Sequence, residues 1–259
     1  MAGLAAITTL FAHYWSEKRI LRAFLNNMKP RSSESHFAMA LDLAGVIHTQ
    51  TPRGEDPPFI PIRLLDILGA TPVSILRRGG CCSGLTRLYI TGLATLGIKA
   101  AQVTLYHAAG QAQHCLAEVS LREQRVLVDP LYGFYFVDIH GMPLALHALR
   151  QGAKPQYRRL PHSSDENYPA NDYYNFAFSN TKTANWTKTW IRRSAYTILK
   201  ALTAGRIDTL SQPLWLEWPQ VTLVAAITVG VLLFNLAMLL QYGSARVLNH
   251  PAFPGDSVS

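Results

Sequence analysis

The chain has 259 residues, of which 49% are hydrophobic and 15% are charged, and its formal net charge is +8. The charged fraction is below the roughly 25% usual in soluble domains, which indicates that part of the chain is not solvated by water. The length allows one domain of about 150–200 residues and additional segments. The basic residues do not alternate with aromatic ones as in nucleic-acid-binding modules, so we expect a membrane rather than nucleic acid as the partner of this charge.

The three cysteines, Cys81, Cys82 and Cys115, do not predict a disulfide framework, because adjacent cysteines seldom pair and an odd count leaves a free thiol. A reducing compartment is therefore expected. The sequence has no C-x-x-C pair for a thiolate zinc site and no cluster of calcium-ligating carboxylates. We expect neither a metal ion nor another cofactor.

Residues 1–30 are interpreted as an N-terminal helical segment. Their apolar part, residues 1–15, is shorter than the about 20 residues that cross a bilayer. It also lacks the basic region and the cleavage site of a secretory signal. We expect a helix that packs on the protein or lies at a membrane interface.

Residues 32–50 predict a helix, because apolar side chains recur at helical spacing after a serine-rich start at residues 32–35. Residues 51–58 end this helix, since they include two consecutive prolines. Short helices or turns are expected at residues 62–68 and 72–77.

Residues 82–96 again show helical periodicity, and Gly97 is suited to end the helix in the left-handed conformation. Three short apolar or alternating runs follow, at residues 101–107, 115–121 and 125–128, with turn residues between them. This order predicts a helix that is followed in the chain by an antiparallel meander of strands. The fold class is therefore α+β, with a core over residues 31–140.

Residues 141–205 are interpreted as an aromatic and basic extension that packs on this core. Residues 186–202 within it predict a basic amphipathic helix. An alternative is that residues 140–220 form a partner-binding face for a membrane biosynthetic or secretion complex. Its aromatic part holds Tyr173, Tyr174, Phe176, Phe178, Trp186 and Trp190.

Residues 221–241 are predicted to be a transmembrane helix, between a juxtamembrane segment at 206–220 and a short tail at 242–259. Residues 221–240 hold no charge, and twenty helical residues cover the about 30 Å of the hydrocarbon layer. Aromatic residues flank the segment as in an interfacial belt; they are Trp215, Trp218 and Tyr242.

The distribution of basic residues predicts the orientation of this helix. Only Arg246 follows it, whereas a run without acidic residues precedes it between positions 182 and 206. By the positive-inside rule the chain is a single-pass, tail-anchored protein with its large N-terminal part in the cytoplasm. The basic residues of the run are Lys182, Lys188, Arg192, Arg193, Lys200 and Arg206.

Cys82, His114 and Asp129 are the candidate catalytic residues. Cys82 lies just after two glycines at a predicted helix start, where the helix dipole favours the nucleophilic thiolate. Gly80 and Ser83 shape this turn, which leaves room for a substrate, and backbone amides there can hold an oxyanion. If the strands pair as a hairpin, His114 and Asp129 meet, and the carboxylate fixes the imidazole tautomer so that the other ring nitrogen serves the thiol.

These motifs resemble the transglutaminase-like superfamily, of papain-like Cys-His-Asp fold, in its bacterial type. Residues 80–86, GCCSGLT, with residues 97–100, GIKA, are similar to its G-x-C-S-G-[aromatic/aliphatic]-A … G-I-x-A signature. Residues 114–119, HCLAEV, are similar to its H-A-W-x-E-V strand, and residues 128–130, VDP, to its closing D-P. The similarity covers about residues 33–135.

The resemblance implies that Cys82, rather than Cys81, is the nucleophile. Leu116 and Thr86 depart from the family pattern and alter the pocket wall without removing a catalytic group. Gln50, or alternatively His48, is a candidate on the oxyanion side. Cys81 is expected to point away from Cys82 and pack inward, and Cys115 to face the other side of the sheet from His114. Glu118 is expected to pair with a basic group or to support its strand.

The expected function is that of a membrane-anchored cysteine enzyme that cleaves an amide or ester bond through a thioester. The resemblance favours a hydrolase or protease over an amine-transferring crosslinker. The alternative is a non-catalytic binding or scaffold protein that keeps the fold. The expected partners are a peptide or other amide- or ester-containing substrate and the membrane.

Overall fold

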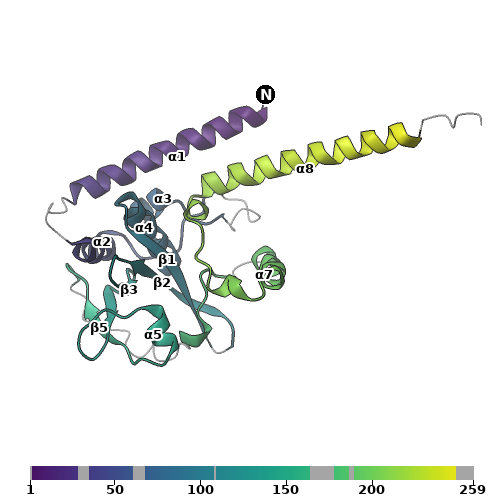
Figure 1. Cartoon of the computed structure of the whole chain (residues 1–259). Helices are drawn as coiled ribbons and strands as arrows, with labels where there is room; N and C mark the ends of the chain where they lie inside the picture. The colour runs from purple at the N-terminus through teal and green to yellow at the C-terminus, as the bar shows by residue number, and fades with distance from the viewer. Residues whose placement is uncertain are drawn as a thin grey trace, which may run out of the picture.

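The computed structural model describes residues 2–28, 35–60, 68–107, 109–163, 178–186 and 190–248. It is α+β, with helices around a five-stranded antiparallel sheet (Figure 1). The strands follow one another in space in chain order, so the sheet is a meander, as predicted. They are β1 Lys99–Tyr106, β2 Ala112–Ser120, β3 Arg125–Asp129, β4 Phe134–Val137 and β5 Gln156–Arg159.

The hairpin of β2 and β3 determines where the two catalytic candidates on the sheet lie. Its register runs from Ser120↔Arg125 to Ala117↔Val128, around a turn closed by the N–H of Leu121 on the carbonyl of Gln124 at 2.9 Å. The start of β2 therefore lies beside the end of β3, as the hairpin hypothesis requires.

Strands β4 and β5 were not predicted from the sequence. β5 reads QYRR and is an edge strand with two exposed arginines, so it lacks the apolar alternation by which strands are recognised. Its pairing with β4, from Phe134↔Arg159 to Val137↔Gln156, carries the sheet beyond residue 140, where the core was expected to end.

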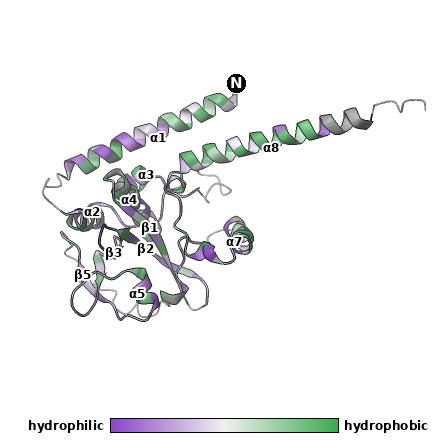
Figure 2. Cartoon of the chain, in the orientation of Figure 1, coloured by the Kyte–Doolittle hydropathy of each residue, from purple (hydrophilic) through white to green (hydrophobic). Residues whose placement is uncertain are grey.

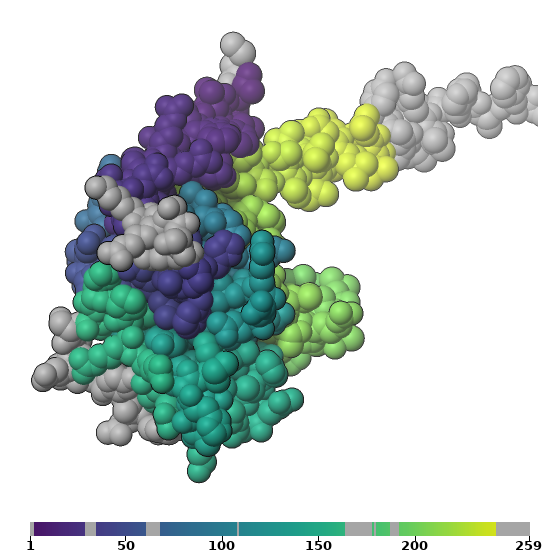
Figure 3. Space-filling model, turned by 60° about the vertical axis from the view of Figure 1, so that its left-hand side comes forward, coloured from purple at the N-terminus to yellow at the C-terminus, as the bar shows by residue number. Residues whose placement is uncertain are grey.

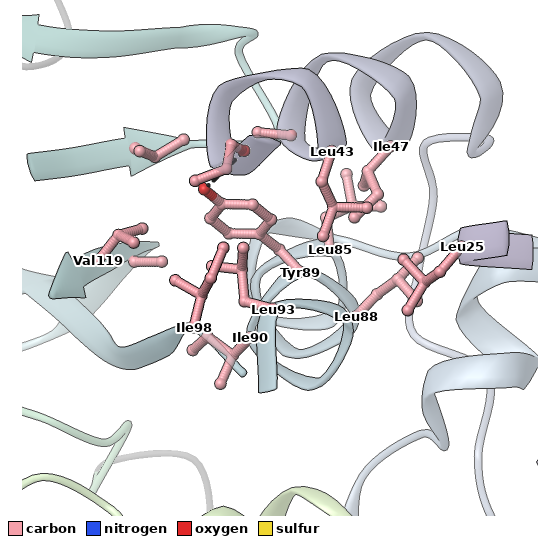
Figure 4. Packing of buried hydrophobic residues seen from close by; sticks show 14 of the residues in the cluster. Leu25, Leu43, Ile47, Leu85, Leu88, Tyr89, Ile90, Leu93, Ile98 and Val119 are labelled. Atoms are coloured by element: carbon pink, nitrogen blue, oxygen red, sulfur yellow. Dashed lines mark hydrogen bonds between the residues drawn. The ribbon is translucent and has the colours of Figure 1, made fainter. Parts of the chain in front are cut away.

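The main core lies where α4 (Cys82–Thr95) packs between the sheet and α2 (His36–Gln50) (Figure 4). Apolar residues three or four positions apart place one face of α4 inward, and the Tyr89 hydroxyl at its centre donates to the carbonyl of Ala40 at 3.0 Å. Gly97, with φ of 78°, follows the helix in the left-handed conformation. The buried side chains include Leu43, Ile47, Leu85, Leu88, Tyr89, Leu93 and Val119.

A second apolar cluster joins the sheet to the short helix α5 (Leu146–Arg150). A carboxylate oxygen of Glu118 accepts from the backbone N–H of Leu146 at 2.9 Å and so stabilises the start of α5. The other carboxylate oxygen of Glu118 lies 3.7 Å from the guanidinium of Arg125 on β3, so Glu118 pairs with a basic group, which was one of the two roles expected for it. The strand residues of this cluster include Val103, Leu105, Leu116, Leu127, Phe134 and Phe136.

The described part of the extension lies against the outer edge of β1. Lys182 and Thr104 exchange backbone hydrogen bonds of 2.6 and 3.0 Å, and the hydroxyl of Tyr106 donates to Ala184 and accepts from the N–H of Trp186. This contact favours the interpretation that the extension covers the core. Other elements here are η2 (Phe178–Asn180), α7 (Trp190–Leu202) and η3 (Arg206–Asp208).

Two long helices project from this body, α1 (Ala2–Asn27) and α8 (Pro219–Leu248) (Figures 1 and 2). The segment Pro219–Gln241 is long and apolar enough to cross a membrane, with a mean hydropathy of 2.5. None of the residues in its most apolar part is buried against the domain. Figure 3 shows α8 standing free of the domain. The short helix η4 (Leu214–Glu217) precedes it.

The helices predicted at residues 32–50, 82–96 and 186–202 overlap α2, α4 and α7, and α3 (Pro72–Arg78) occupies one of the two expected short turns. Several predictions fall outside the described residues. They concern the turn at residues 62–68, apart from Leu68, and the aromatic residues Tyr173, Tyr174 and Phe176.

Candidate active site

Cys82 is the first residue of α4, and two loops hold this end of the helix in place. The loop after α2 pairs with the turn before α4, where the N–H of Gly80 donates to Pro52 at 3.1 Å and Gly80 accepts from Gly54 at 3.2 Å. Gly79 has φ of 92°, a conformation that L side chains rarely adopt. The position of the cysteine therefore depends on the glycine pair, as the sequence indicated.

His114 and Asp129 form a buried pair, with 2.6 Å between Nε2 of the imidazole and Oδ2 of the carboxylate. They come from β2 and from the end of β3. The other oxygen of Asp129 accepts from the N–H groups of Leu131 at 2.8 Å and Tyr132 at 3.0 Å, which fixes the carboxylate. The ring of Tyr132 lies 5.1 Å from that of His114, centroid to centroid.

The side chain of Cys82 lies close enough to the ring of His114 to raise the pKa of the imidazole. Since Nε2 of the imidazole faces Asp129, Nδ1 is the ring nitrogen left for the thiol. The structure thus brings the three predicted residues together in the order thiol, imidazole and carboxylate.

Opposing effects set the pKa of His114. Burial of the ring lowers the pKa, whereas the charge of Asp129, its hydrogen bond to the ring and the neighbouring Cys82 together raise it to about 10. The imidazole is therefore a cation at neutral pH, held between two groups that can carry negative charge. An imidazolium beside a thiol favours the thiolate form.

Asp56 lies at the start of α4 and was not among the residues predicted for the site. Its Oδ1 accepts from the N–H of Cys81 at 2.9 Å and its Oδ2 from the hydroxyl of Ser83 at 2.9 Å. A Cβ atom at Gly80 or Gly84 would lie 2.8 or 2.1 Å from Oδ1. Gly80 and Gly84 therefore leave room for the Asp56 carboxylate.

The donors that Asp56 accepts from do indicate that an acceptor is needed at the start of α4. Cys81 is the N-cap residue of α4 and makes no side-chain capping hydrogen bond, and cysteine is a poor N-cap. The first N–H groups of a helix need acceptors, so an acceptor from another segment was to be expected. Sequence alone does not identify which residue supplies it.

Cys81 differs from its predicted placement. Its thiol lies 3.2 Å from the hydroxyl of Ser83 and contacts the side chain of Cys82, because the extended N-cap residue turns its side chain toward the first helical turn. The hydrogen bond with Cys82, burial and the charge of Asp56 raise the pKa of Cys81 strongly. Cys81 is therefore a protonated neighbour of Cys82.

Cys115 lies apart from the pair, as strand alternation predicts. Its sulfur is buried beside Nε2 of Gln102 at 3.5 Å and the hydroxyl of Thr104 at 3.6 Å, whereas the ring of His114 faces Asp129. The carbonyl of Cys115 accepts from the hydroxyl of Thr86 at 3.2 Å. Thr86, a departure from the family pattern, thus links the cysteine helix to the histidine strand.

The two candidates for the oxyanion side lie differently. Nδ1 of His48 is 3.0 Å from the carbonyl of Leu131, and Nε2 is 3.3 Å from a guanidinium nitrogen of Arg53. His48 therefore ties α2 to the turn that holds Asp129, which is a positioning role. Gln50 is exposed at the last position of α2, and no hydrogen bond within the described residues joins it to Cys82 or His114.

Three cavities lie away from these residues. One of about 560 Å³ is at the turn of the β2–β3 hairpin, between residues 35–37 and 121–124. One of about 440 Å³ lies where α4 passes into β1, beside Gly97 and Leu214, and one of about 290 Å³ lies between α1, α4 and Trp215. Within the described ranges, no group of three or more His, Cys, Asp or Glu side chains is arranged to hold a metal ion.

Comparisons of the chain with protein-family models, curated proteins and solved structures give no match. A half-buried thiol, a buried imidazolium and a fixed carboxylate in series at a helix start are suited to nucleophilic attack followed by proton transfer.

Proposed function

We propose that this protein is a membrane-anchored cysteine enzyme of the transglutaminase-like type, which hydrolyses an amide or ester bond. The observation that supports this most is the position of Cys82 beside His114, whose Nε2 lies 2.6 Å from Asp129. The β2–β3 hairpin brings His114 together with Asp129, and the packing of α4 on the sheet adds Cys82 to them. Transfer to an amine instead of water is the second outcome of the same chemistry.

The thiolate of Cys82 attacks the carbonyl carbon, and the carbonyl oxygen becomes an oxyanion near the N–H groups at the start of α4. His114 gives its Nδ1 proton to the leaving amine or alkoxide, the bond to the leaving group breaks, and the acyl group remains as a thioester. His114, now neutral, accepts a proton from water as the water attacks the thioester. The acid is released and the thiolate–imidazolium pair is restored.

The membrane is the second part of the proposal. The segment Pro219–Gln241 has the length and composition of a membrane span. The run of basic residues between positions 182 and 206 precedes it in the chain, and only Arg246 follows it. A single-pass anchor with the catalytic domain in the cytoplasm accounts for both.

The experiment is alkylation by iodoacetamide at pH 7 of the full chain in detergent, with the modified cysteine identified by mass spectrometry. Cys82 should react first, and Cys81→Ala, the matched neighbour, should keep this reaction while Cys82→Ala loses it. His114→Ala should slow the labelling of Cys82 by about tenfold or more, because a free thiol is only a few per cent ionised at this pH.

Equal labelling of Cys82 in wild type and His114→Ala would contradict an activated thiolate and leave the non-catalytic scaffold as the function. Incubation with an activated ester extends the test, since the intact mass of the wild-type chain should show an acyl adduct that is absent from Cys82→Ala. Hydroxylamine should remove this adduct if it is a thioester.

A further inference from the structure

The first half of α1 is apolar and exposed. No Asp, Glu, Lys or Arg precedes Glu17 in the chain, and large apolar side chains there face outward: Leu4 is 70%, Phe11 43% and Trp15 53% exposed. Single exposed apolar residues are ordinary on soluble proteins, whereas a charge-free helical surface of this kind is not.

The other side of α1 is occupied. Leu21 and Leu25 are buried in the domain core, and one helical face leads from them through Tyr14 to Leu10 and Ile7, which are half-buried. The ring of Tyr14 meets that of Trp218 edge to face at 5.1 Å. The orientation of the helix is therefore fixed, with Leu4, Phe11 and Trp15 directed away from the domain.

Buried polar contacts fix where α1 meets α8. Glu17, 6% exposed, accepts from the hydroxyl of Thr71 at 2.5 Å and from Nε2 of Gln220 at 2.7 Å. The same nitrogen of Gln220 lies 2.9 Å from Nδ1 of His13. We call these residues, Glu17, His13, Thr71 and Gln220, the junction.

The apolar part of both helices begins at the junction. α1 is without charge on its N-terminal side and carries Lys18, Arg19 and Arg22 on the other, while α8 is apolar beyond Gln220 and follows Glu217. Figures 1 and 2 show both apolar parts leaving the domain on the same side. A bilayer crossed by α8 would therefore meet α1 at the same level.

We infer that the first half of α1 enters the bilayer beside α8, within the leaflet next to the domain. This rests on the proposal that α8 spans the membrane. The residues from Gly3 to Phe11 cover about 14 Å at 1.5 Å per residue, which is about one leaflet and too short to span. Shallow insertion is expected, because a helix end deep in hydrocarbon is costly.

The residues around the junction suit the membrane interface. Trp15 is an interfacial residue type, and Nζ of Lys18 lies 5.3 Å from the ring centroids of both Tyr14 and Trp15. In this arrangement the ammonium group of Lys18 lies at the level of the lipid headgroups. The domain is then held by two helices and cannot rotate freely about α8.

The test uses nitroxide labels on single cysteines in the full chain, reconstituted in phospholipid nanodiscs, with Cys81, Cys82 and Cys115 replaced by serine and folding checked by circular dichroism. The labelled variants are Leu4→Cys, Phe11→Cys, Leu232→Cys, Arg19→Cys and Glu123→Cys. The measurement is the ratio of the accessibility of each label to oxygen, which enriches in lipid, and to a water-soluble nickel complex.

We expect this ratio to be above one at positions 4, 11 and 232 and below one at positions 19 and 123. Oxygen-dominated relaxation at 232 with nickel-dominated relaxation at 4 and 11 would overturn the inference and leave the anchor intact. A nickel-dominated label at 232 would contradict the anchor itself. Immobile labels at 4 and 11 that neither reagent reaches would indicate a protein partner or a second copy, and would also overturn the inference.

Discussion

The His114–Asp129 pair combines strong burial with charge. The imidazole is 5% exposed and the carboxylate is fully buried, so each charge depends on the other for compensation. Asp129 is held by two backbone N–H groups, and His48 holds the turn that supplies them. The orientation of the histidine is therefore built up from residues that do not touch the thiol.

This pair makes stability depend on pH. The folded-state pKa of His114, about 10, lies above its value of 6.5 as a free group. The pair should therefore contribute fully below about pH 6.5, and its contribution should decrease as the pH rises toward 10. The measurement is the thermal midpoint by circular dichroism in detergent between pH 6 and 9.5. The thermal midpoint of the wild type should fall further from pH 6 to 9.5 than that of His114→Gln. An equal fall in both proteins would contradict the raised pKa.

Asp56 should stabilise the start of α4. Asp56→Ala removes the acceptor of the Cys81 N–H and of the Ser83 hydroxyl, and loss of a helix cap costs about 1–2 kcal/mol of unfolding free energy. Its neighbour Glu55 is exposed, so Glu55→Ala is the matched control and should change stability by less than about 0.5 kcal/mol. Urea unfolding followed by circular dichroism measures both, and equal effects would rule out the capping role.

At the level of elements, the cysteine helix is tied to the start of α8. Arg87 on α4 donates to Glu217 of η4 at 2.9 Å and to the carbonyl of Ala70 at 2.6 Å. Burial and the charge of Arg87 lower the pKa of the nearby Arg192 on α7. The buried Arg87–Glu217 pair therefore joins α4 to η4, and a shift at the start of α8 would be transmitted to the helix that begins at Cys82.

Loss of the buried Arg87–Glu217 pair should lower the free energy of unfolding far more than loss of a surface ion pair. Arg87→Ala leaves the Glu217 carboxylate, 2% exposed, without its partner, and such changes cost about 3–5 kcal/mol. Arg125 pairs with Glu118 at 3.7 Å from an exposed position, so Arg125→Ala should cost at most about 1 kcal/mol. Denaturation of both variants in the same detergent makes the comparison, and similar losses would show that the buried pair contributes little.

At the level of the whole molecule, the proposed anchor α8 is a helix whose apolar side chains face away from the domain. Its exposed apolar residues, such as Leu232 and Leu236, have no described protein segment to pack on. A protease that removes a tag placed after Ser259 in intact cells, while the domain stays protected, would match a cytoplasmic domain. Leu232→Asp combined with Leu236→Asp should keep the tag inside, because each charge costs about 2.5–3.5 kcal/mol at the membrane centre.

The matched control for this prediction is Ile139→Asp, since Ile139 is 70% exposed on the domain and its replacement should leave the tag accessible. A tag that stays exposed in the doubly substituted chain would show that α8 is not the anchor. A digested domain with a protected tag would reverse the proposed orientation.

Several parts of this protein were predictable from local signals in the chain. Apolar periodicity and Gly97 defined the helix that begins at Cys82, alternation defined the β2–β3 hairpin with His114 and Asp129 at its open end, and an uncharged run of twenty residues defined α8. Each signal lies within about twenty residues of chain, which is the range over which secondary structure and hairpins are encoded.

Contacts between segments far apart in the chain became known from the fold alone. The acceptor for the start of α4 came from Asp56, the partner of the fourth strand was a polar segment some twenty residues away, and α1 met α8 through Glu17 and Gln220, which are 203 positions apart. Such contacts depend on the packing of elements that are each compatible with many neighbours. The sequence therefore indicated the candidate residues of the site, while the fold decided how they are supported and how the domain lies beside its apolar helices.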